Sequence, residues 1–275
     1  MLKRVYLEIT NVCNLACAFC PGTERRPGFV SVEDFRRLLM KLQGRTEYLY
    51  FHLMGEPLLH PQLEALFSIA QELGFRVILT TNGTRLSEKG HILTEAVALH
   101  KVNVSLQSFE ANDGGVLEDY LAACVSFVKE AAAAGKLCEL RLWNQGGLET
   151  LNDRIRGLLE AAFPPPWSNS RTGKKMSERV WLEPGETFSW PDLRAGDLGE
   201  SCFCYGLRDQ IGVLCDGTVV PCCLDHNGDI ALGNLFTQEL DDILSTERAK
   251  QLVDGFSRRR AVEPLCRTCG YARRF

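Results

Sequence analysis

The amino-acid sequence predicts an α/β fold of parallel βαβ units, in an open sheet or a barrel, followed by a small cysteine-rich module. Through residue 163, short apolar runs alternate with amphipathic helical patterns. After residue 200, seven of the twelve cysteines occur close together. The chain of 275 residues is long enough for one large domain with such a module attached.

Each element of this prediction follows from an apolar run or a helical period. The expected strands are Val5–Thr10, Tyr48–Met54, Arg76–Thr81, Val102–Leu106 and Cys138–Trp143. The expected helices are Val32–Leu42, Pro61–Leu73, Glu88–Leu99, Glu118–Ala134 and Asn152–Ala162. Pro61 suits a first helical turn, and Gly74 suits a helix stop. In such folds the functional residues lie at the carboxyl ends of the strands.

The second half of the chain divides by composition into two further segments. We expect a core domain over 1–163 and a linker or lid over 164–200, which is rich in Pro, Ser, Gly, Trp and charge. A sixth strand at Arg179–Leu182 would complete a barrel. The cysteine-rich module occupies 201–275, where Asp216-Gly217 indicates a two-residue hairpin turn and Leu240–Phe256 a helix.

Charge and hydropathy exclude several classes of protein. The 31 basic and 35 acidic residues give a net charge of −4, so no global basic field attracts nucleic acid. No run approaches the roughly 18 apolar residues of a membrane span, and the N-terminus lacks a secretory signal. We therefore expect a cytoplasmic protein without nucleic-acid or membrane partners. Cytosolic thiols stay reduced, which favours metal or redox chemistry over disulfides.

Three cysteines follow the first expected strand with the spacing C-x3-C-x2-C, at Cys13, Cys17 and Cys20. Structural zinc prefers closed sites with four ligands, usually from C-x2-C pairs. Iron–sulfur clusters take thiolates from closely spaced cysteines. Three thiolates on a four-iron cluster leave one iron open, which indicates chemistry rather than scaffolding. Structural zinc or buried free thiols remain the alternatives.

With Phe19 before the last cysteine, this motif resembles the C-x3-C-x-aromatic-C signature of the radical S-adenosylmethionine (radical SAM) enzymes. The resemblance implies a partial (β/α)6 TIM-like barrel with a 4Fe-4S cluster on Cys13, Cys17 and Cys20. The open iron would bind the amino and carboxylate groups of S-adenosylmethionine. One electron would then cleave the sulfonium, giving methionine and a 5′-deoxyadenosyl radical.

Other loops fit the same resemblance. Where the family has Gly-Gly-Glu after strand two, this chain reads Met54-Gly55-Glu56, and Glu56 would contact the methionine ammonium. Phe19 would flank the adenine. Polar contacts to the ribose and the methionine carboxylate would come from Thr81, Asn82 and Ser105. After Ser105 the family often shows Asp-Gly, whereas this chain has Leu-Gln-Ser.

The C-terminal cysteines resemble the auxiliary-cluster module called SPASM, or its shortened twitch form. The resemblance implies one closed 4Fe-4S cluster on Cys204, Cys222, Cys266 and Cys269. Cys202 could replace Cys204 and Cys223 could replace Cys222, and a four-cysteine zinc site is the rival metal centre. Three other cysteines are expected to serve no cluster: Cys215 beside the hairpin turn, and the buried Cys124 and Cys138. Such a closed cluster accepts an electron from a substrate radical or simply bounds the pocket.

The sequence therefore predicts an enzyme that abstracts hydrogen from an unidentified substrate, with a flavodoxin- or ferredoxin-type reductant. Strand one starts close to Met1 and little follows the auxiliary module, which favours dehydrogenation of a small polyol or amino sugar. Modification of a ribosomal peptide is the alternative. A non-catalytic electron carrier or metal-responsive regulator is the hypothesis from another class. Candidate pocket residues are Arg141, Trp143, Asn144, Trp181 and Trp190, and no catalytic residue is assigned.

Overall fold

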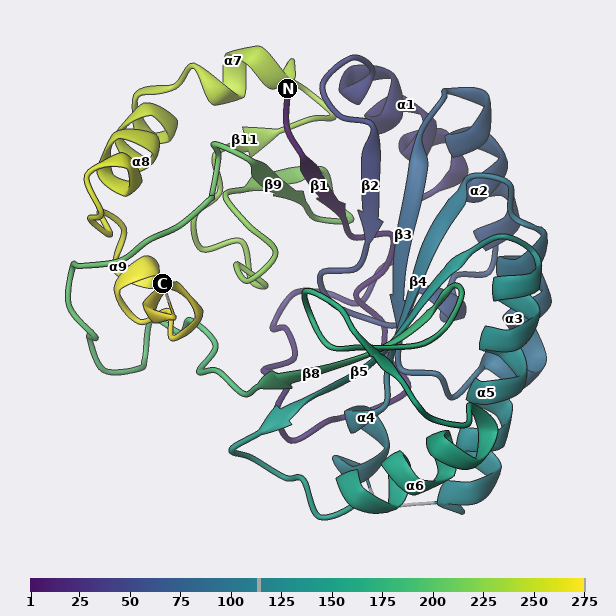
Figure 1. Ribbon diagram of the computed structural model, residues 1–275. Helices are drawn as coiled ribbons and strands as arrows, with labels where there is room; N and C mark the ends of the chain where they lie inside the picture. The colour runs from purple at the N-terminus through teal and green to yellow at the C-terminus, as the bar shows by residue number, and fades with distance from the viewer. Residues whose placement is uncertain (113–114, 275) are drawn as a thin grey trace.

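The computed structural model describes residues 1–112 and 115–274, and parallel strands form its centre (Figure 1). Within these residues, seven parallel strands pair in the order β9 (Gln210–Val213), β1 (Arg4–Leu7), β2 (Tyr48–Phe51), β3 (Arg76–Thr81), β4 (Leu99–Ser105), β5 (Leu137–Gln145) and β8 (Val180–Glu186). Antiparallel strands extend both edges: β10 (Thr218–Val220) and β11 (Gly233–Asn234) beyond β9, and β7 (Lys174–Ser177) and β6 (Ser168–Asn169) beyond β8. The predicted α/β class and partial barrel are confirmed.

Helices cover the outer face of this sheet (Figure 1). They are α1 (Val32–Leu42), α2 (Leu63–Glu72), α3 (Leu86–Glu95), α5 (Leu117–Ala133) and α6 (Asn152–Ala162), with the short η1 (Pro57–Leu59) and α4 (Gln107–Glu110) in the loops after β2 and β4. Their apolar faces and the outward strand residues form one continuous core. None of the described helices has both the length and the apolar character needed to cross a bilayer.

The cysteine-rich module is continuous with the barrel sheet. β9 pairs in parallel with β1, and Arg4 lies beside Gln210 in the register. Beyond β11 follow α7 (Leu240–Leu244), α8 (Glu247–Ser257), α9 (Pro264–Arg267) and η2 (Tyr271–Arg273). Of these helices, α8 and α9 lie away from the helices of the barrel (Figure 1), whereas α7 begins beside the end of α1, where Lys41 contacts Glu239 at 3.1 Å. The module therefore extends the same sheet past its first strand.

Several expected boundaries were wrong, for local reasons. Pro61 precedes α2 rather than starting it, because the His60 ring accepts the Gln62 N–H at 3.2 Å and holds a turn there. The third helix ends at Glu95, and Leu99 pairs with Val77 of β3 as the first residue of β4. A short apolar run satisfies either period, so the sequence alone did not separate helix from strand.

Two predictions in the C-terminal module also needed correction. The expected helix over 240–256 is two helices, because Thr246 adopts an extended conformation and its hydroxyl accepts the Ala249 N–H as an N-cap. The hairpin loop has three residues rather than two. The Leu214 N–H donates to the Thr218 carbonyl and the Gly217 N–H to the Leu214 carbonyl, with Gly217 at a φ of +83°.

Candidate functional site

The loop with the cysteine triplet runs from the end of β1 toward α1. Cys13 and Cys20 are exposed and Cys17 is half-buried, and the Cys20 N–H donates to the Cys17 carbonyl at 2.9 Å. Asn112, which follows α4, holds the loop: its amide donates to the Cys17 sulfur at 3.1 Å and accepts the Ala16 N–H at 3.0 Å. The sequence analysis missed Asn112, and its only signal was a position after the fourth strand.

The three thiols suit a cluster better than a single ion. Among the described residues, no three His, Cys, Asp or Glu side chains lie close enough to hold one metal ion. A four-iron cluster takes one thiolate per iron, so its ligands stand farther apart than the ligands of one ion. Burial raises the pKa of Cys13 and Cys17, and the charge of Cys20 raises both further. A bound cluster would offset these costs of ionisation, so the donor set fits it.

Glu56 is the centre of a buried polar group beside this loop. Its side chain is only 1% exposed. One carboxylate oxygen accepts the Thr81 hydroxyl at 2.7 Å and the Leu58 N–H at 3.1 Å, and the other accepts the Asn82 N–H at 2.7 Å. Burial raises the pKa of Glu56, while these donors lower it. The fold thus brings together residues predicted from loops after two different strands.

The Glu56 group also reaches the cysteine loop. The Asn82 side-chain amide donates to the Asn14 side chain at 3.0 Å and lies 3.9 Å from the Cys13 sulfur. Gly55 has a φ of +78°, and a Cβ there would lie 2.5 Å from the Thr10 carbonyl oxygen. Only glycine allows this approach of the two loops. Gly55, Glu56, Thr81 and Asn82 therefore form one unit with the cysteine loop.

The other two residues predicted to contact S-adenosylmethionine stand apart from this unit. Phe19 is 39% exposed in the cysteine loop. Ser105 ends β4, and its carbonyl accepts the Ser108 hydroxyl at 2.7 Å. Within the described residues, no hydrogen bond joins the side chain of Ser105 to Glu56. The roles of Phe19 and Ser105 stay predictions.

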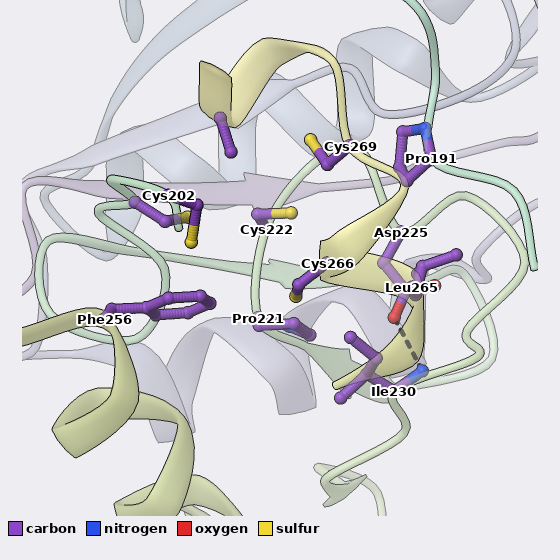
Figure 2. Close-up of a pocket in the computed structure, with 12 residues that line it drawn as sticks. Pro191, Cys202, Pro221, Cys222, Asp225, Ile230, Phe256, Leu265, Cys266 and Cys269 are labelled. Atoms are coloured by element: carbon purple, nitrogen blue, oxygen red, sulfur yellow. Dashed lines mark hydrogen bonds between the residues drawn. The ribbon is translucent and has the colours of Figure 1, made fainter. Parts of the chain in front are cut away.

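A second cysteine-lined site lies in the C-terminal module. A cavity of about 30 Å³ is lined by apolar side chains, Asp225 and five cysteines (Figure 2): Cys202, Cys204, Cys222, Cys266 and Cys269. All four predicted ligands line it, together with Cys202. Burial, with the neighbouring cysteine charges, raises the pKa of Cys204 to about 11. Binding of iron or zinc would therefore displace protons from these thiols.

The remaining cysteines point elsewhere. Cys223 lies outside the pocket and packs with Tyr6, and burial raises its pKa to about 12. Cys215 faces Glu8 and Arg25, and burial raises its pKa to about 12 as well. Cys124 and Cys138 are fully buried, as expected. Cys202 thus fits the pocket as an alternative ligand, whereas Cys223 does not.

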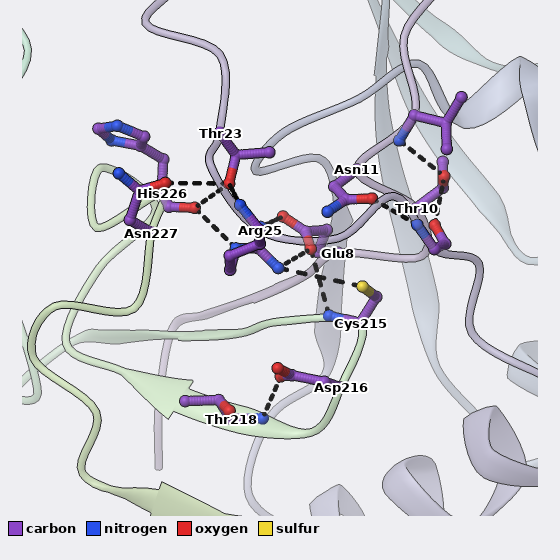
Figure 3. A network of polar contacts seen from close by, with 12 residues as sticks. Glu8, Thr10, Asn11, Thr23, Arg25, Cys215, Asp216, Thr218, His226 and Asn227 are labelled. Carbon is purple, nitrogen blue, oxygen red and sulfur yellow. Dashed lines mark hydrogen bonds and ion pairs between the residues drawn. The ribbon is translucent and has the colours of Figure 1, made fainter.

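A buried ion pair connects the cysteine loop to the module (Figure 3). The fully buried Glu8 carboxylate accepts hydrogen bonds from both terminal nitrogens of Arg25, at 2.8 and 2.6 Å, and from the Cys215 N–H at 3.2 Å. The Arg25 Nε donates to the His226 carbonyl at 2.9 Å. Thr23 adds hydrogen bonds to His226 and Asn227. We call Glu8 and Arg25 with these partners the interdomain clamp.

The candidate pocket residues on β5 do not all lie on the same face of the sheet. On β5, Arg141 and Trp143 face away from the helices, and the Arg141 guanidinium carbon lies 4.4 Å from the Trp143 ring centre. Asn144 points the other way and exchanges hydrogen bonds with Asn152 of α6, at 2.9 and 3.1 Å. Its assignment to the pocket was wrong. Trp181 stands on β8, and Trp190 contacts the ring of His226.

Comparison with known proteins identifies the class. A Radical SAM superfamily model matches residues 7–134, and an iron-sulfur cluster-binding SPASM model matches residues 202–270. A GTP 3′,8-cyclase of Chlorobaculum tepidum is 33% identical over 91% of this chain and 86% of that relative. The chain belongs to the radical SAM superfamily, which is a superfamily of enzymes. The two matches imply 4Fe-4S clusters, and the electron-carrier hypothesis loses its support.

Other relatives agree at the level of fold. A tungsten-containing aldehyde ferredoxin oxidoreductase cofactor-modifying protein of Pyrococcus furiosus is 33% identical, but over 32% of this chain and 26% of its own length. BtrN in complex with AdoMet and 2-DOIA superposes with a TM-score of 0.61 at 19% identity, covering 98% of this chain and 93% of BtrN. SuiB of Streptococcus suis bound to S-adenosylmethionine gives 0.64 at 15% identity, covering 92% and 68%. The chain spans about a third or less of the first curated relatives it matches.

Proposed function

We propose that this enzyme removes hydrogen from a small polyol or amino sugar in a net oxidation. Bound 4Fe-4S clusters and AdoMet supply the one-electron and hydrogen-abstracting chemistry. Cys13, Cys17 and Cys20 would hold the first cluster, and Cys204, Cys222, Cys266 and Cys269 the second. We expect a flavodoxin- or ferredoxin-type protein to deliver the electron.

Glu56 is suited to orient AdoMet through its amino group. A carboxylate offers about four lone-pair sites, and three of them already accept Thr81, Leu58 and Asn82. The three bonds fix the carboxylate in one orientation beside the cysteine loop. The remaining site can accept an ammonium in a charge-assisted bond. Thr81 and Asn82 then act by positioning Glu56 rather than by touching AdoMet alone.

The single observation that carries the oxidation is the five-cysteine pocket. Its other walls are mainly apolar, including Ile230, Phe256 and Leu265. Four thiolates there would saturate a cluster, so no iron is open for a substrate. A saturated, apolar-walled cluster is suited to transfer electrons. This supports an electron-accepting role, which makes the net reaction an oxidation.

Two other substrate classes are suggested by named neighbours. SuiB has been solved bound to the precursor peptide SuiA, and anSMEcpe with AdoMet and the Cp18Cys peptide. These likenesses keep peptide modification as the second candidate function. The GTP 3′,8-cyclase relatives suggest a nucleotide. A triphosphate needs several cations, and the inward-facing Lys101 and Arg141 share Glu139, which offsets part of their charge and makes a triphosphate the less favoured substrate.

The test is anaerobic reconstitution with iron and sulfide, in the wild type and in a Cys13→Ala/Cys17→Ala/Cys20→Ala variant. We expect about eight irons per chain to fall to about four, and reduced wild type alone to release 5′-deoxyadenosine from AdoMet. A Cys223→Ser variant serves as the control and should keep all its iron. If the C-terminal site held zinc instead of the second four irons, it could not accept an electron, and the proposed net oxidation would be wrong. Absence of 5′-deoxyadenosine would overturn the proposal as a whole.

A further inference from the structure

A cavity lies on the outer face of the sheet, between α6 and the edge formed by β7 and β8. Its volume of about 370 Å³ falls in the range of roughly 300–1,000 Å³ that is typical of small-molecule sites. Leu142 of β5 and Leu182 of β8 line it and also belong to the core under the helices. Arg141 and Glu183 alternate with them and face the barrel interior. The sheet therefore separates this cavity, which we call the outer cavity, from the site expected for AdoMet.

Two cationic side chains from different elements line the outer cavity. They are Arg156 of α6 and Lys174 of β7, which is the register partner of Leu182. Arg156 contacts Asp153 at 3.2 Å, but the Asp153 side chain is 95% exposed, so water weakens this pair. Lys174 donates to the neutral side chain of Asn169 at 2.6 Å, and no carboxylate in the described part of the chain pairs with it. Both positive charges are therefore available to an anionic ligand.

Asn152 adds a buried donor one helical turn before Arg156. Its side chain lines the outer cavity and is only 9% exposed. The amide nitrogen donates to Asn144 at 3.1 Å, and the amide oxygen accepts from Asn144 at 2.9 Å. An amide nitrogen carries two protons, and the second has no hydrogen-bond partner among the described residues. An anionic oxygen in the outer cavity would satisfy this N–H.

The remaining lining suits an apolar body and gives a bound anion one orientation. The Trp167 ring is held in place because its Nε1 donates to the Phe163 carbonyl at 2.7 Å. Pro184 adds a further apolar contact from β8. Glu160 lies one turn beyond Arg156, on the side away from Asn152, and its carboxylate would repel an anion. The anionic end of a ligand is therefore directed toward Asn152 and Arg156.

We propose that the outer cavity is a second small-molecule site, which binds an anion with an apolar body, either a carboxylate or a phosphate monoester. Arg156 and Asn152 hold the anionic group, Lys174 adds charge, and Trp167 and Leu182 contact the body. A bound ligand joins α6 to the β6–β7 hairpin. Because the sheet lies between this site and the barrel interior, the ligand is not the molecule that loses hydrogen. The inference goes beyond the proposed function and does not depend on it.

The test is binding to the reconstituted enzyme with AdoMet, measured by saturation-transfer NMR and calorimetry. The probes are 4-phenylbutyrate, its neutral amide, phenyl phosphate and inorganic phosphate. We expect one or both of the aromatic anions to bind at least about tenfold more tightly than the amide and inorganic phosphate, which each lack one recognised part. The tighter of the two identifies the anionic group. Binding of neither aromatic anion, or equal binding of 4-phenylbutyrate and its amide, would overturn the site.

Variants of α6 and β7 test the residues that hold the anion. Arg156→Gln and Lys174→Gln should each weaken binding of the anionic probe by about tenfold, because a bond to a charged group is lost. Arg154→Gln removes the same charge from the same helix, but Arg154 pairs with Glu118 outside the outer cavity. It is the matched control and should bind like the wild type. Equal losses in Arg154→Gln and Arg156→Gln would mean non-specific attraction and would overturn the site.

Amide hydrogen exchange, followed by mass spectrometry, locates the bound probe. Saturation with the anionic probe should slow exchange in α6 and in residues 168–177, and should leave β1 and β9 unchanged. Slower exchange in the loops after β1 and β2, without a change in α6, would place the probe in the barrel and overturn the outer site. Release of 5′-deoxyadenosine is read separately, so this site can fail while the radical SAM activity stands.

Discussion

At the scale of single residues, Gly55 has a matched counterpart in Gly44. Both have a left-handed backbone, with φ of +78° and +73°, but a Cβ at Gly44 meets nothing within 4 Å. Gly44→Ala should therefore lower the free energy of unfolding by about 1 kcal/mol. Gly55→Ala adds a clash with the Thr10 carbonyl and should cost about 2–4 kcal/mol. Urea unfolding of both variants measures the difference, and equal losses would contradict the close approach.

The folding stability of the protein should depend on pH through a single residue, Glu183. Burial, with the neighbouring Glu139, raises the pKa of Glu183 from 4.5 to about 7, although Arg141 and Lys101 oppose the shift. Because the folded pKa lies above the unfolded one, the stabilisation is complete below about pH 4.5 and is lost as the pH rises through about 7. Glu183→Gln cannot ionise, so its melting temperature should gain on that of the wild type between about pH 5 and pH 8.

The control for this titration is Glu72→Gln. Glu72 is exposed and its pKa is lowered by Arg36, so its contribution does not change over that range. Melting curves of the three proteins across the same buffers provide the measurement. Parallel profiles for the wild type and Glu183→Gln would show that Glu183 is ionised throughout.

At the scale of elements, the interdomain clamp joins β1, the loop after Cys20 and the β9–β10 hairpin. Arg25→Ala would leave the fully buried Glu8 carboxylate without its cation, and we expect the free energy of unfolding to fall by about 3–5 kcal/mol. Replacing both partners, as Glu8→Gln with Arg25→Met, should cost less because no buried charge remains. Arg36→Ala breaks an exposed pair and should cost about 0–1 kcal/mol. Denaturant unfolding gives the free energy of unfolding of all three variants. Equal losses in Arg25→Ala and Arg36→Ala would contradict a stabilising role for the interdomain clamp.

Elements also show what the sequence could and could not predict. Both ends of α1 and α6 were predicted correctly, because the helical repeat of their apolar residues can be read within each segment alone. Glu56 was predicted through the resemblance of Met54-Gly55-Glu56 to the Gly-Gly-Glu that the family has after its second strand. Asn112, the interdomain clamp and the outer cavity depend on contacts between distant segments, which no spacing reveals. Asn144 was misplaced because a strand exposes alternate residues, and the sequence did not show which set faced inward.

At the scale of the whole molecule, one sheet passes through both cysteine sites. Cys13–Cys20 follow β1, and Cys222 follows β10, which pairs with β9. Val5 and Leu7 of β1 and Ile211 and Val213 of β9 are all fully buried. The radical SAM barrel and the C-terminal module therefore share a hydrophobic core and strand hydrogen bonds. A loss of stability in one part should therefore lower the stability of the other.

This continuity predicts that metal loss from the module reaches the barrel. Without its metal, the site would leave protonated thiols around a small cavity of about 30 Å³, with no bonds joining the cysteine-bearing segments, and this should loosen β9 and β10. In the triple cysteine variant, loaded only at the C-terminal site, chelation should speed amide hydrogen exchange in β9 and also in β1, measured by mass spectrometry. α6 and β7, at the far edge of the sheet, should exchange as before. Faster exchange confined to residues 201–274, with β1 unchanged, would show instead that the module loosens independently of the barrel.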